Sequence, residues 1–401
     1  MDSSKRLAET DLEWAVGINR TSLKILGLWP DDKLTRRQSL VADARAFSIF
    51  LLMMLTAILP QMFAMFHVWG DIMAFTDNLQ LSVPFSVTVM KFFIMWIRKE
   101  ELKPLVNMIV NDWFKTKTAL ERATMIKQAR IARTIVMLGG IMMTLASIIL
   151  IIPPCFGYSM RYVTNITDLG KPLLLQSYFF REIESPFFEV AFIGQALSIS
   201  LAAISYTGID NFLGLVVFHI CAQLDLLKYR LLNLHNFRDF NASLSYNVKD
   251  HLRLIRSVDA IDNTFNLMLL ALLLFFGILF CMQGFLIISI IDGNGGDVSI
   301  MRICWLVSIL INTFAHMCLY CIVGEILIAK CDGVYYATYG LAWYTLKPNQ
   351  ARDMMLMMIR AEKPLYITAG RIFPMTMSLF CSVRHSQFDK DIGWIYIRIA
   401  Y

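Results

Sequence analysis

Residues 134–156 read TIVMLGGIMMTLASIILIIPPCF, a run of 23 residues without one charged side chain. At a rise of about 1.5 Å per residue, a helix of this length crosses the roughly 30 Å hydrocarbon core of a bilayer. Further apolar stretches of similar length lie before and after it. The sequence therefore predicts seven transmembrane helices, at about 46–66, 78–97, 134–156, 187–208, 266–290, 301–327 and 365–383.

The composition of the 401 residues agrees with this interpretation. Apolar residues make up 57% of the chain and charged residues 17%, against roughly 25% charged residues in soluble proteins. The mean hydropathy is +0.56. These values exclude a soluble globular protein, a disordered chain and a disulfide-rich secreted scaffold. We expect an all-α membrane protein.

The distribution of basic residues predicts the orientation of the chain. Loops on the N-terminal side of the membrane carry 28 of the 37 Lys and Arg residues, and loops on the other side carry six. Basic residues are enriched in cytosolic loops, so we expect a cytosolic N-terminus and an extracellular C-terminus. G-protein-coupled receptors have the opposite orientation and are excluded. The net charge of +6 lies where it meets anionic lipid, so we expect no nucleic-acid partner.

The cytosolic segments are expected to be helical. In 102–114 the apolar residues recur at steps of three and one, which places them on one face of an α-helix. A helix lying on the membrane and a helix running on from the second span into a cytosolic bundle both have this pattern. We favour the bundle. Two further helical candidates cover 224–234 and 251–265.

Motifs of known catalytic and metal-binding chemistry are missing from the sequence. It has no nucleophile elbow, no phosphate-binding loop and no histidine or cysteine spacing suited to a metal, so we expect no enzyme activity and no cofactor. An Asn-x-Thr motif at Asn165 lies in the predicted outer loop, which makes Asn165 the expected glycosylation site. Asn19 and Asn241 match the same pattern but face the cytosol, and we expect them to be bare.

Several ordered motifs carry a family resemblance. They are YGLAWY at 339–344, MMIRAEKP at 357–364, TAGRIF at 368–373, NDW at 111–113 and SPFFE at 185–189. Together they resemble the insect odorant receptors in order and spacing. The sister gustatory receptors carry a TYxxxxxQF signature in the last helix, which is not found here.

The resemblance implies a subunit of a ligand-gated, non-selective cation channel in the plasma membrane of sensory neuron dendrites. Its implied partners are an olfactory co-receptor, in a hetero-tetramer, and a small volatile odorant. A gustatory-type receptor and a membrane transporter are the alternatives; the absence of an internal repeat weighs against the transporter. The implied organisation is a cytosolic region at 1–45, six spans with the ligand pocket and cytosolic extensions at 46–327, a cytosolic helix at 328–364, a pore-lining span at 365–383 and an atypical extracellular tail at 384–401.

A pocket for an odorant should be apolar and aromatic, with one or two polar groups. Each candidate in the outer halves of the spans has helix packing or lipid contact as its alternative role. Gln195 and Asn312 are favoured, because an amide in a span usually faces the bundle interior. The expected ligand-binding residues are Phe85, Val89, Ile152, Phe156, Phe188, Phe192, Gln195, Ile199, Trp305, Ser308, Ile309 and Asn312.

Charged and polar positions in two spans lead to further expectations. Lys91, near the middle of the second span, should pair with a carboxylate or a carbonyl; contact with the ligand or the pore is the alternative. In the last span, polar and flexible side chains recur at helical steps of three and four, which indicates a stripe facing the pore or the bundle. We expect Arg371 to snorkel or pair near the cytosolic boundary. The expected pore-lining residues are Thr368, Met375, Ser378 and Ser382.

The sequence after Val383 departs from the family pattern. Five titratable residues occur among the eight positions of 384–391, where family members have apolar and aromatic residues around a hydrophobic gate. Either the last helix ends early here, or the tail is not the family's tail. An alternative or unspliced last exon is one hypothesis, because Val-Arg codons can match a splice donor.

Overall fold

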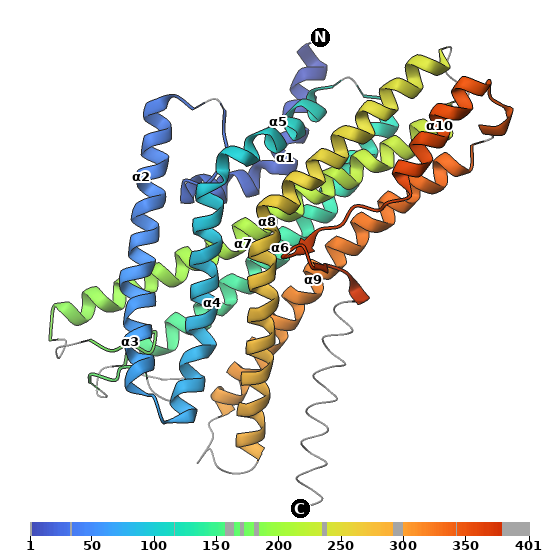
Figure 1. Cartoon of the computed structure of the whole chain (residues 1–401). Coiled ribbons are helices and arrows are strands. Elements are labelled where there is room, and N and C mark those ends of the chain that lie inside the picture. Colours follow the sequence, from blue (N-terminus) through green and yellow to red (C-terminus); the bar gives the residue numbers. More distant parts are fainter. Residues whose placement is uncertain are drawn as a thin grey trace, which may run out of the picture. The chain divides into compact units, whose positions relative to one another are not determined.

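The computed structural model describes residues 2–32, 34–115, 117–156, 164–168, 172–179, 184–234, 239–291, 300–341 and 343–378. Nearly all of these residues lie in helices (Figure 1). The long helices are α1 (Asp2–Leu26), α2 (Arg36–Met53), α3 (Leu59–His67), α4 (Ile72–Ile97), α5 (Lys99–Phe114), α6 (Ala119–Cys155), α7 (Phe187–Leu232), α8 (Phe240–Ile291), α9 (Ile300–Tyr339) and α10 (Pro348–Ala361). The short elements are a π-helical turn η1 (Met54–Ile58), a 3-10 turn η3 (Trp343–Thr345) and two strands, β1 (Thr368–Ala369) and β2 (Phe373–Pro374).

The described residues contain six helical segments that are long and apolar enough to cross a membrane. They contain the first six spans that the sequence predicts, so these predictions are confirmed. The segments are Arg36–His67, Ile72–Ile97, Ala119–Cys155, Phe187–Leu232, Phe240–Ser289 and Ile303–Thr345. Several are much longer than the roughly 20 residues that a bilayer needs, because the spans continue into extramembrane helix.

The chain forms two compact units. The first unit, called the outer unit below, comprises Met1–Trp113, Ala132–Leu213 and Ala271–Phe314, and it holds most of the predicted spans. The second, called the anchor unit below, comprises Phe114–Ile131, Gly214–Leu270 and Ala315–Tyr401. The long helices α6 to α9 each contribute residues to both units.

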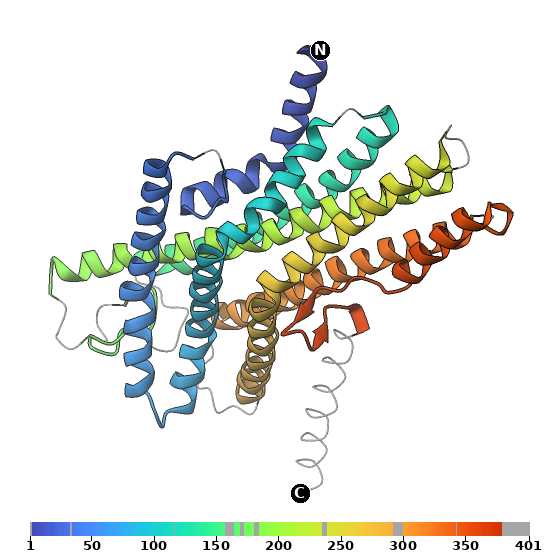
Figure 2. The same cartoon turned by 45° about the horizontal axis from the view of Figure 1, so that its top comes forward.

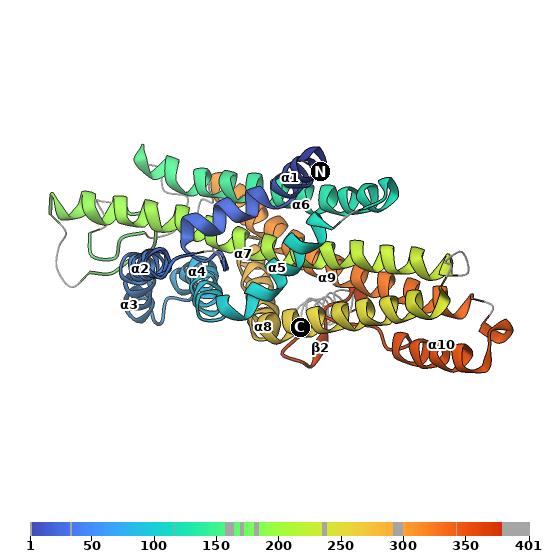
Figure 3. The same cartoon turned by 90° about the horizontal axis from the view of Figure 1, so that it is seen from above.

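In the outer unit, α2 and α3 follow one another along one line through η1, and α4 stands beside both (Figures 1 and 2). Figure 3 shows them from the end. The π turn η1 joins α2 to α3 just before Pro60, which has no N–H to donate to a helix. Within that turn, the hydroxyl of Thr56 lies 2.6 Å from the hydroxyl of Ser198 on α7. Gly194 permits this approach, because a Cβ there would lie 3.0 Å from the Thr56 methyl group.

The helices predicted over 102–114, 224–234 and 251–265 are confirmed as helices. The stripe of 102–114 is mostly buried within α5, which agrees with a bundle rather than a helix lying on a membrane. In the anchor unit, Leu224, Leu227 and Leu231 are buried on α7, and Leu234 is buried just after its end. The stripe of 251–265 lies on α8 and is buried apart from Leu252.

The predicted last span is wrong in its first half. Residues 365–376 do not form a helix: β1 and β2 pair antiparallel, with Thr368 opposite Pro374. Gly370 and Arg371 have φ angles of 63° and 59° and form the turn between the strands. Such angles are incompatible with a right-handed helix. Residues 379–401, which include Ser382 and the atypical tail, lie outside the described residues.

Candidate functional site

All twelve expected ligand-binding residues belong to the outer unit. Five of them are buried: Phe85, Val89, Gln195, Ile199 and Trp305. Five are half-buried: Phe188, Phe192, Ser308, Ile309 and Asn312. The remaining two, Ile152 on α6 and Phe156 just after its end, are 48% and 74% exposed and do not share the buried surroundings of the others.

Contacts between some of these candidates are direct. The rings of Phe188 and Phe192, one turn apart at the start of α7, have centroids 6.2 Å apart. Phe85 and Val89 are also one turn apart, on the buried side of α4. The amide nitrogen of Asn312 lies 4.0 Å from the sulfur of Met143, which brings α9 to α6.

Gln195 is engaged with the outer loop of its own chain. Its Oε1 accepts hydrogen bonds from the backbone N–H groups of Leu174 and Leu175, at 3.2 and 3.1 Å. Its Nε2 donates to the hydroxyl of Ser177 at 2.8 Å. The loop is also held from the first span, because the N–H of Tyr178 donates to the carbonyl of Pro60. The Gln195 amide therefore anchors the segment 172–179 to α7.

Other buried polar groups of the outer unit have no hydrogen-bond partner among the described residues. They include the indole N–H of Trp305 and the whole side-chain amides of Gln80 on α4 and Gln283 on α8. Buried polar groups in proteins are nearly always paired with protein, water or a ligand. Trp305 was an expected site residue. The two glutamines were missed, although an amide inside a predicted span was a signal that could have found them.

Lys91 is fully buried in the outer unit, and its predicted carboxylate partner is confirmed. The ammonium donates to both carboxylate oxygens of Asp210 on α7, at 2.7 and 2.9 Å. It also lies 3.7 Å from the centroid of the Tyr206 ring, one turn earlier on the same helix. Ion pairing and a cation–π contact together compensate the desolvation of this charge.

In the anchor unit, the described part of the expected pore stripe is held by α8. The carboxylate of Asp262 accepts from both the N–H and the hydroxyl of Thr368, at 2.7 and 2.8 Å. Arg371 donates to the side-chain oxygen of Asn263 at 2.6 Å, so its predicted pairing is confirmed. Met375 is buried, and its backbone packs against Gly324 of α9, where no side chain would fit. Thr368, Arg371 and Met375 therefore do not share one helical face, and the predicted stripe is wrong for these residues.

Helices α6, α7 and α9 are linked in the anchor unit through Asp225 on α7. Its carboxylate accepts from Gln128 of α6 at 3.0 Å and from Lys330 of α9 at 2.9 Å. Nearby, Arg230 and Arg253 both pair with Asp250 at 2.8 Å. Among the described residues, no group of three or more His, Cys, Asp or Glu side chains is placed to hold a metal ion.

Asn165, the expected glycosylation site, lies in the outer loop with only 2% of its surface exposed. Its side-chain oxygen accepts from the backbone N–H groups of Thr167 and Asp168, at 3.1 and 3.2 Å. A glycan on the Asn165 amide therefore requires modification before this segment folds.

Comparison with known proteins identifies similar chains. The profile of the family described as "7tm Odorant receptor" matches residues 71–387. Odorant receptor 10 of Aedes albopictus is 21% identical over 212 residues, which are 51% of this chain and 55% of that one. Odorant receptor Or2 of Anopheles gambiae is 26% identical over 220 residues, 51% of this chain and 56% of that one. The matched part thus spans about half the length of these curated relatives.

The fold resembles that of solved structures. The olfactory receptor OR5 from Machilis hrabei superposes with a TM-score of 0.81, over 95% of this chain and 97% of that chain, at 16% sequence identity. Its complex with eugenol superposes with a TM-score of 0.80, over 96% and 98% of the two chains, at the same identity. At this identity the likeness establishes the fold alone.

Proposed function

The chain belongs to the odorant receptor family, and on that premise we propose that it is the odorant-binding subunit of a ligand-gated, non-selective cation channel. It would act in the plasma membrane of sensory neuron dendrites, together with a co-receptor subunit in a hetero-tetramer. The gustatory-type receptor and the transporter are not retained, because the profile that matches most of the chain is that of odorant receptors.

The observation that carries the proposal is the make-up of the outer unit. It contains the buried candidates Phe85, Val89, Ile199 and Trp305, and also buried polar groups that have no hydrogen-bond partner among the described residues. Buried apolar walls with a few convergent polar groups are typical of sites for small ligands. The ligand is proposed to be small, volatile and largely apolar, with a hydrogen-bond acceptor for the Trp305 indole. The Machilis hrabei receptor was solved in complex with a small molecule, eugenol.

The remaining candidates take different places in this proposal. Phe188, Phe192, Ser308, Ile309 and Asn312 are half-buried and are proposed to form the sides of the pocket. Gln195 is proposed to act through the loop that it anchors, since its amide is engaged with 174–177. Ile152 and Phe156, the two exposed residues, are proposed as outer rim contacts.

The pore-lining role is proposed for the chain beyond the β1–β2 hairpin. Thr368 is bound by Asp262 and Met375 is buried, so neither is free to line a water-filled path within the described unit. Ser378 is exposed at the start of a helical turn. We therefore propose the pore-lining role for Ser378 and for Ser382, which lies outside the described residues.

The experiment is a current recording from cells that express the chain with and without the co-receptor. We expect evoked cation current from at least one volatile only when both subunits are present. Two ligands of equal shape, with and without an acceptor oxygen, then test the site. Trp305→Phe removes one buried hydrogen-bond donor, and we expect it to weaken the oxygenated ligand about 10-fold and to spare the hydrocarbon.

The matched control is Trp69→Phe, because Trp69 is 75% exposed in the same unit. We expect this variant to respond to both ligands like the unmodified receptor. A channel that reaches the cell surface and answers no volatile would contradict the proposed function. If Trp305→Phe weakened the responses to the oxygenated ligand and to the hydrocarbon equally, the role assigned to the indole would be contradicted.

A further inference from the structure

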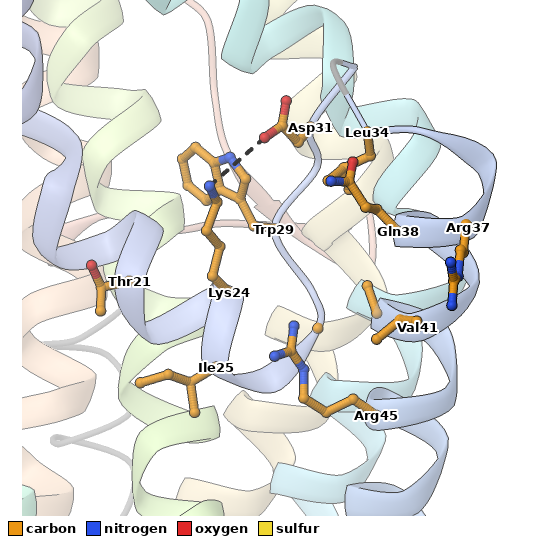
Figure 4. A pocket seen from close by; sticks show the side chains of 12 residues that line it. Thr21, Lys24, Ile25, Trp29, Asp31, Leu34, Arg37, Gln38, Val41 and Arg45 are labelled. Carbon is orange, nitrogen blue, oxygen red and sulfur yellow. Dashed lines mark ion pairs between the residues drawn. The ribbon is translucent and has the colours of Figure 1, made fainter.

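A pocket of about 560 Å³ lies at the end of the outer unit that precedes the first span. Figure 4 shows it between the C-terminal end of α1, the connecting segment 27–35 and the first turns of α2. Lys24 comes from α1, and Arg37 and Arg45 come from α2. None of the residues proposed to bind an odorant lines this pocket.

The charges that line the pocket are not balanced. Three basic side chains face one carboxylate, that of Asp31. The Lys24 ammonium lies 3.9 Å from that carboxylate, at the limit of an ion pair. Arg37 and Arg45 have no ion pair or side-chain hydrogen bond among the described residues.

The nearest other carboxylates are already engaged. Asp43, one turn from the pocket on α2, accepts hydrogen bonds from Trp96 and Lys99. Asp32, in the connecting segment, is bound by Asn107 of α5. Since these acidic groups have partners elsewhere, the excess positive charge of the pocket is left for a ligand.

Apolar side chains lie among the basic ones around the pocket. Ile25 of α1, Leu34 of the connection and Val41 of α2 line it and remain 48%, 37% and 60% exposed. Leu7 and Ile18 are exposed on the same face of α1 as Ile25, because the spacings of 11 and 7 residues are near-multiples of the helical repeat. A helix with this pattern lies in a membrane interface.

The predicted topology places the pocket in the head-group layer of the cytosolic leaflet. Arg45 directly precedes the apolar run that begins at residue 46, so it lies at the edge of the hydrocarbon. Arg37 lies eight residues earlier on the same helix, about 12 Å deeper in the cytosol at 1.5 Å per residue. The polar layer of one leaflet is roughly 5–8 Å thick, so the stretch of α2 from Arg45 to Arg37 passes through all of it.

We propose that this pocket binds the head group of an anionic phospholipid that carries more than one phosphate. The unbalanced charge is divided between separate arginines, which suits several anionic groups better than one. Arg45 and Arg37 would hold phosphates through the planar donor fork of the guanidinium, and Lys24 would approach as a point charge. The first methylenes of the acyl chains would rest on Ile25, which lies with Arg45 at the lower edge of the pocket in Figure 4. Basic pockets beside cytosolic helix ends are known to hold such head groups.

The experiment counts lipids bound to the full chain, purified in detergent, by native mass spectrometry. Phosphatidylinositol 4,5-bisphosphate is the probe, and phosphatidylserine and soluble inositol trisphosphate are the comparison arms. Each basic residue near a membrane surface is worth about fivefold in affinity, so Arg37→Gln with Arg45→Gln should weaken the bisphosphate lipid about 25-fold. We expect phosphatidylserine and the soluble head group to bind much more weakly than the lipid.

The matched control removes two positive charges outside the pocket, with Lys5→Gln and Arg36→Gln. We expect less than a twofold change, although Arg36 adjoins Arg37. Arg37→Lys with Arg45→Lys keeps the charge but not the donor fork, so it should bind the lipid more tightly than the glutamine variant and less tightly than the unmodified chain, which separates a local site from a folding defect. Equal weakening by the pocket and control variants would overturn the proposal. So would a soluble head group that binds as tightly as the lipid, or an absence of bound lipid on the unmodified chain.

Discussion

Two basic sites of the outer unit, the Lys91 site and the pocket between α1 and α2, differ in whether their positive charges have protein partners. Lys91 is completely buried, and Asp210 and Tyr206 surround its ammonium. In the pocket, Arg37 and Arg45 are left without partners among the described residues. The difference follows from the solvent. A charge in hydrocarbon is unstable without a protein partner, whereas a charge in the head-group layer meets water and lipid phosphate.

The largest effect in this comparison is expected from breaking the buried pair. Lys91→Met leaves the Asp210 carboxylate buried without its cation, which costs about 3–5 kcal/mol. We expect severe loss of folded receptor at the cell surface, measured by surface labelling and by size-exclusion chromatography.

The matched control for this variant is the double variant Lys91→Met with Asp210→Asn. It removes both charges, so we expect it to recover much of the surface expression. Wild-type expression of Lys91→Met alone would show that the pair is not needed for folding.

A smaller effect is expected from Gln195→Leu. The substitution leaves the N–H groups of Leu174 and Leu175 and the hydroxyl of Ser177 without their partner. We expect the loss of about 1–3 kcal/mol of local stability and an altered ligand preference across an odorant panel. Hydrogen exchange should rise in 172–179, and Ser200→Ala, on an exposed position of the same helix, should leave it unchanged. Unaltered exchange in Gln195→Leu would refute the anchoring role.

The ring beneath the Lys91 ammonium allows a finer test. Tyr206→Leu removes the cation–π contact, whereas Tyr206→Phe keeps the ring. We expect the leucine variant to be less stable than the phenylalanine variant by about 1–2 kcal/mol, as a difference in thermal denaturation. Equal stability of the two variants would remove the ring from the account of how Lys91 is accommodated.

The smallest effect on stability is expected from substituting Arg45 in the pocket between α1 and α2. Arg45→Gln removes a cation that has no protein partner, so we expect a change within about 0.5 kcal/mol of folding stability in lipid-free detergent. A marked loss there would mean that Arg45 has a structural role, and the contrast with Lys91 would fail. In bilayers with the bisphosphate lipid, the stabilisation by lipid should fall in this variant.

Expectations from the sequence held best where they depended on local pattern. Most of the stripe of 102–114 is buried on α5, and Leu224, Leu227 and Leu231 are buried on α7, because helical periodicity repeats over a few neighbouring residues. The same reasoning failed at 365–376. Thr368, Arg371 and Met375 have helical spacing, yet Gly370 turns the chain and Asp262, more than 100 residues earlier, fixes it. A periodic pattern does not reveal a partner so remote in the sequence.

For the candidate site, the sequence identified residue types rather than their roles. Gln195 was expected to touch a ligand because an amide in a span faces the interior. It does face the interior, and there it binds the chain's own loop. Trp305 was expected because an odorant pocket should be aromatic, and its indole N–H has no hydrogen-bond partner among the described residues. Only the packed structure separates an amide that is engaged from an indole that is available.

By itself, the sequence determined that this protein is a helical membrane protein, where its first six spans lie and that Lys91 needs a partner. These properties follow from hydropathy and from the cost of charge in hydrocarbon, which act residue by residue along the chain. The tertiary structure decided that the partner is Asp210, 119 residues away, and that residues 368–374 form a hairpin. It also decided that Arg37 and Arg45 have no ion-pair partner among the described residues. Pairing depends on which side chains meet in space, and that is a property of the whole fold.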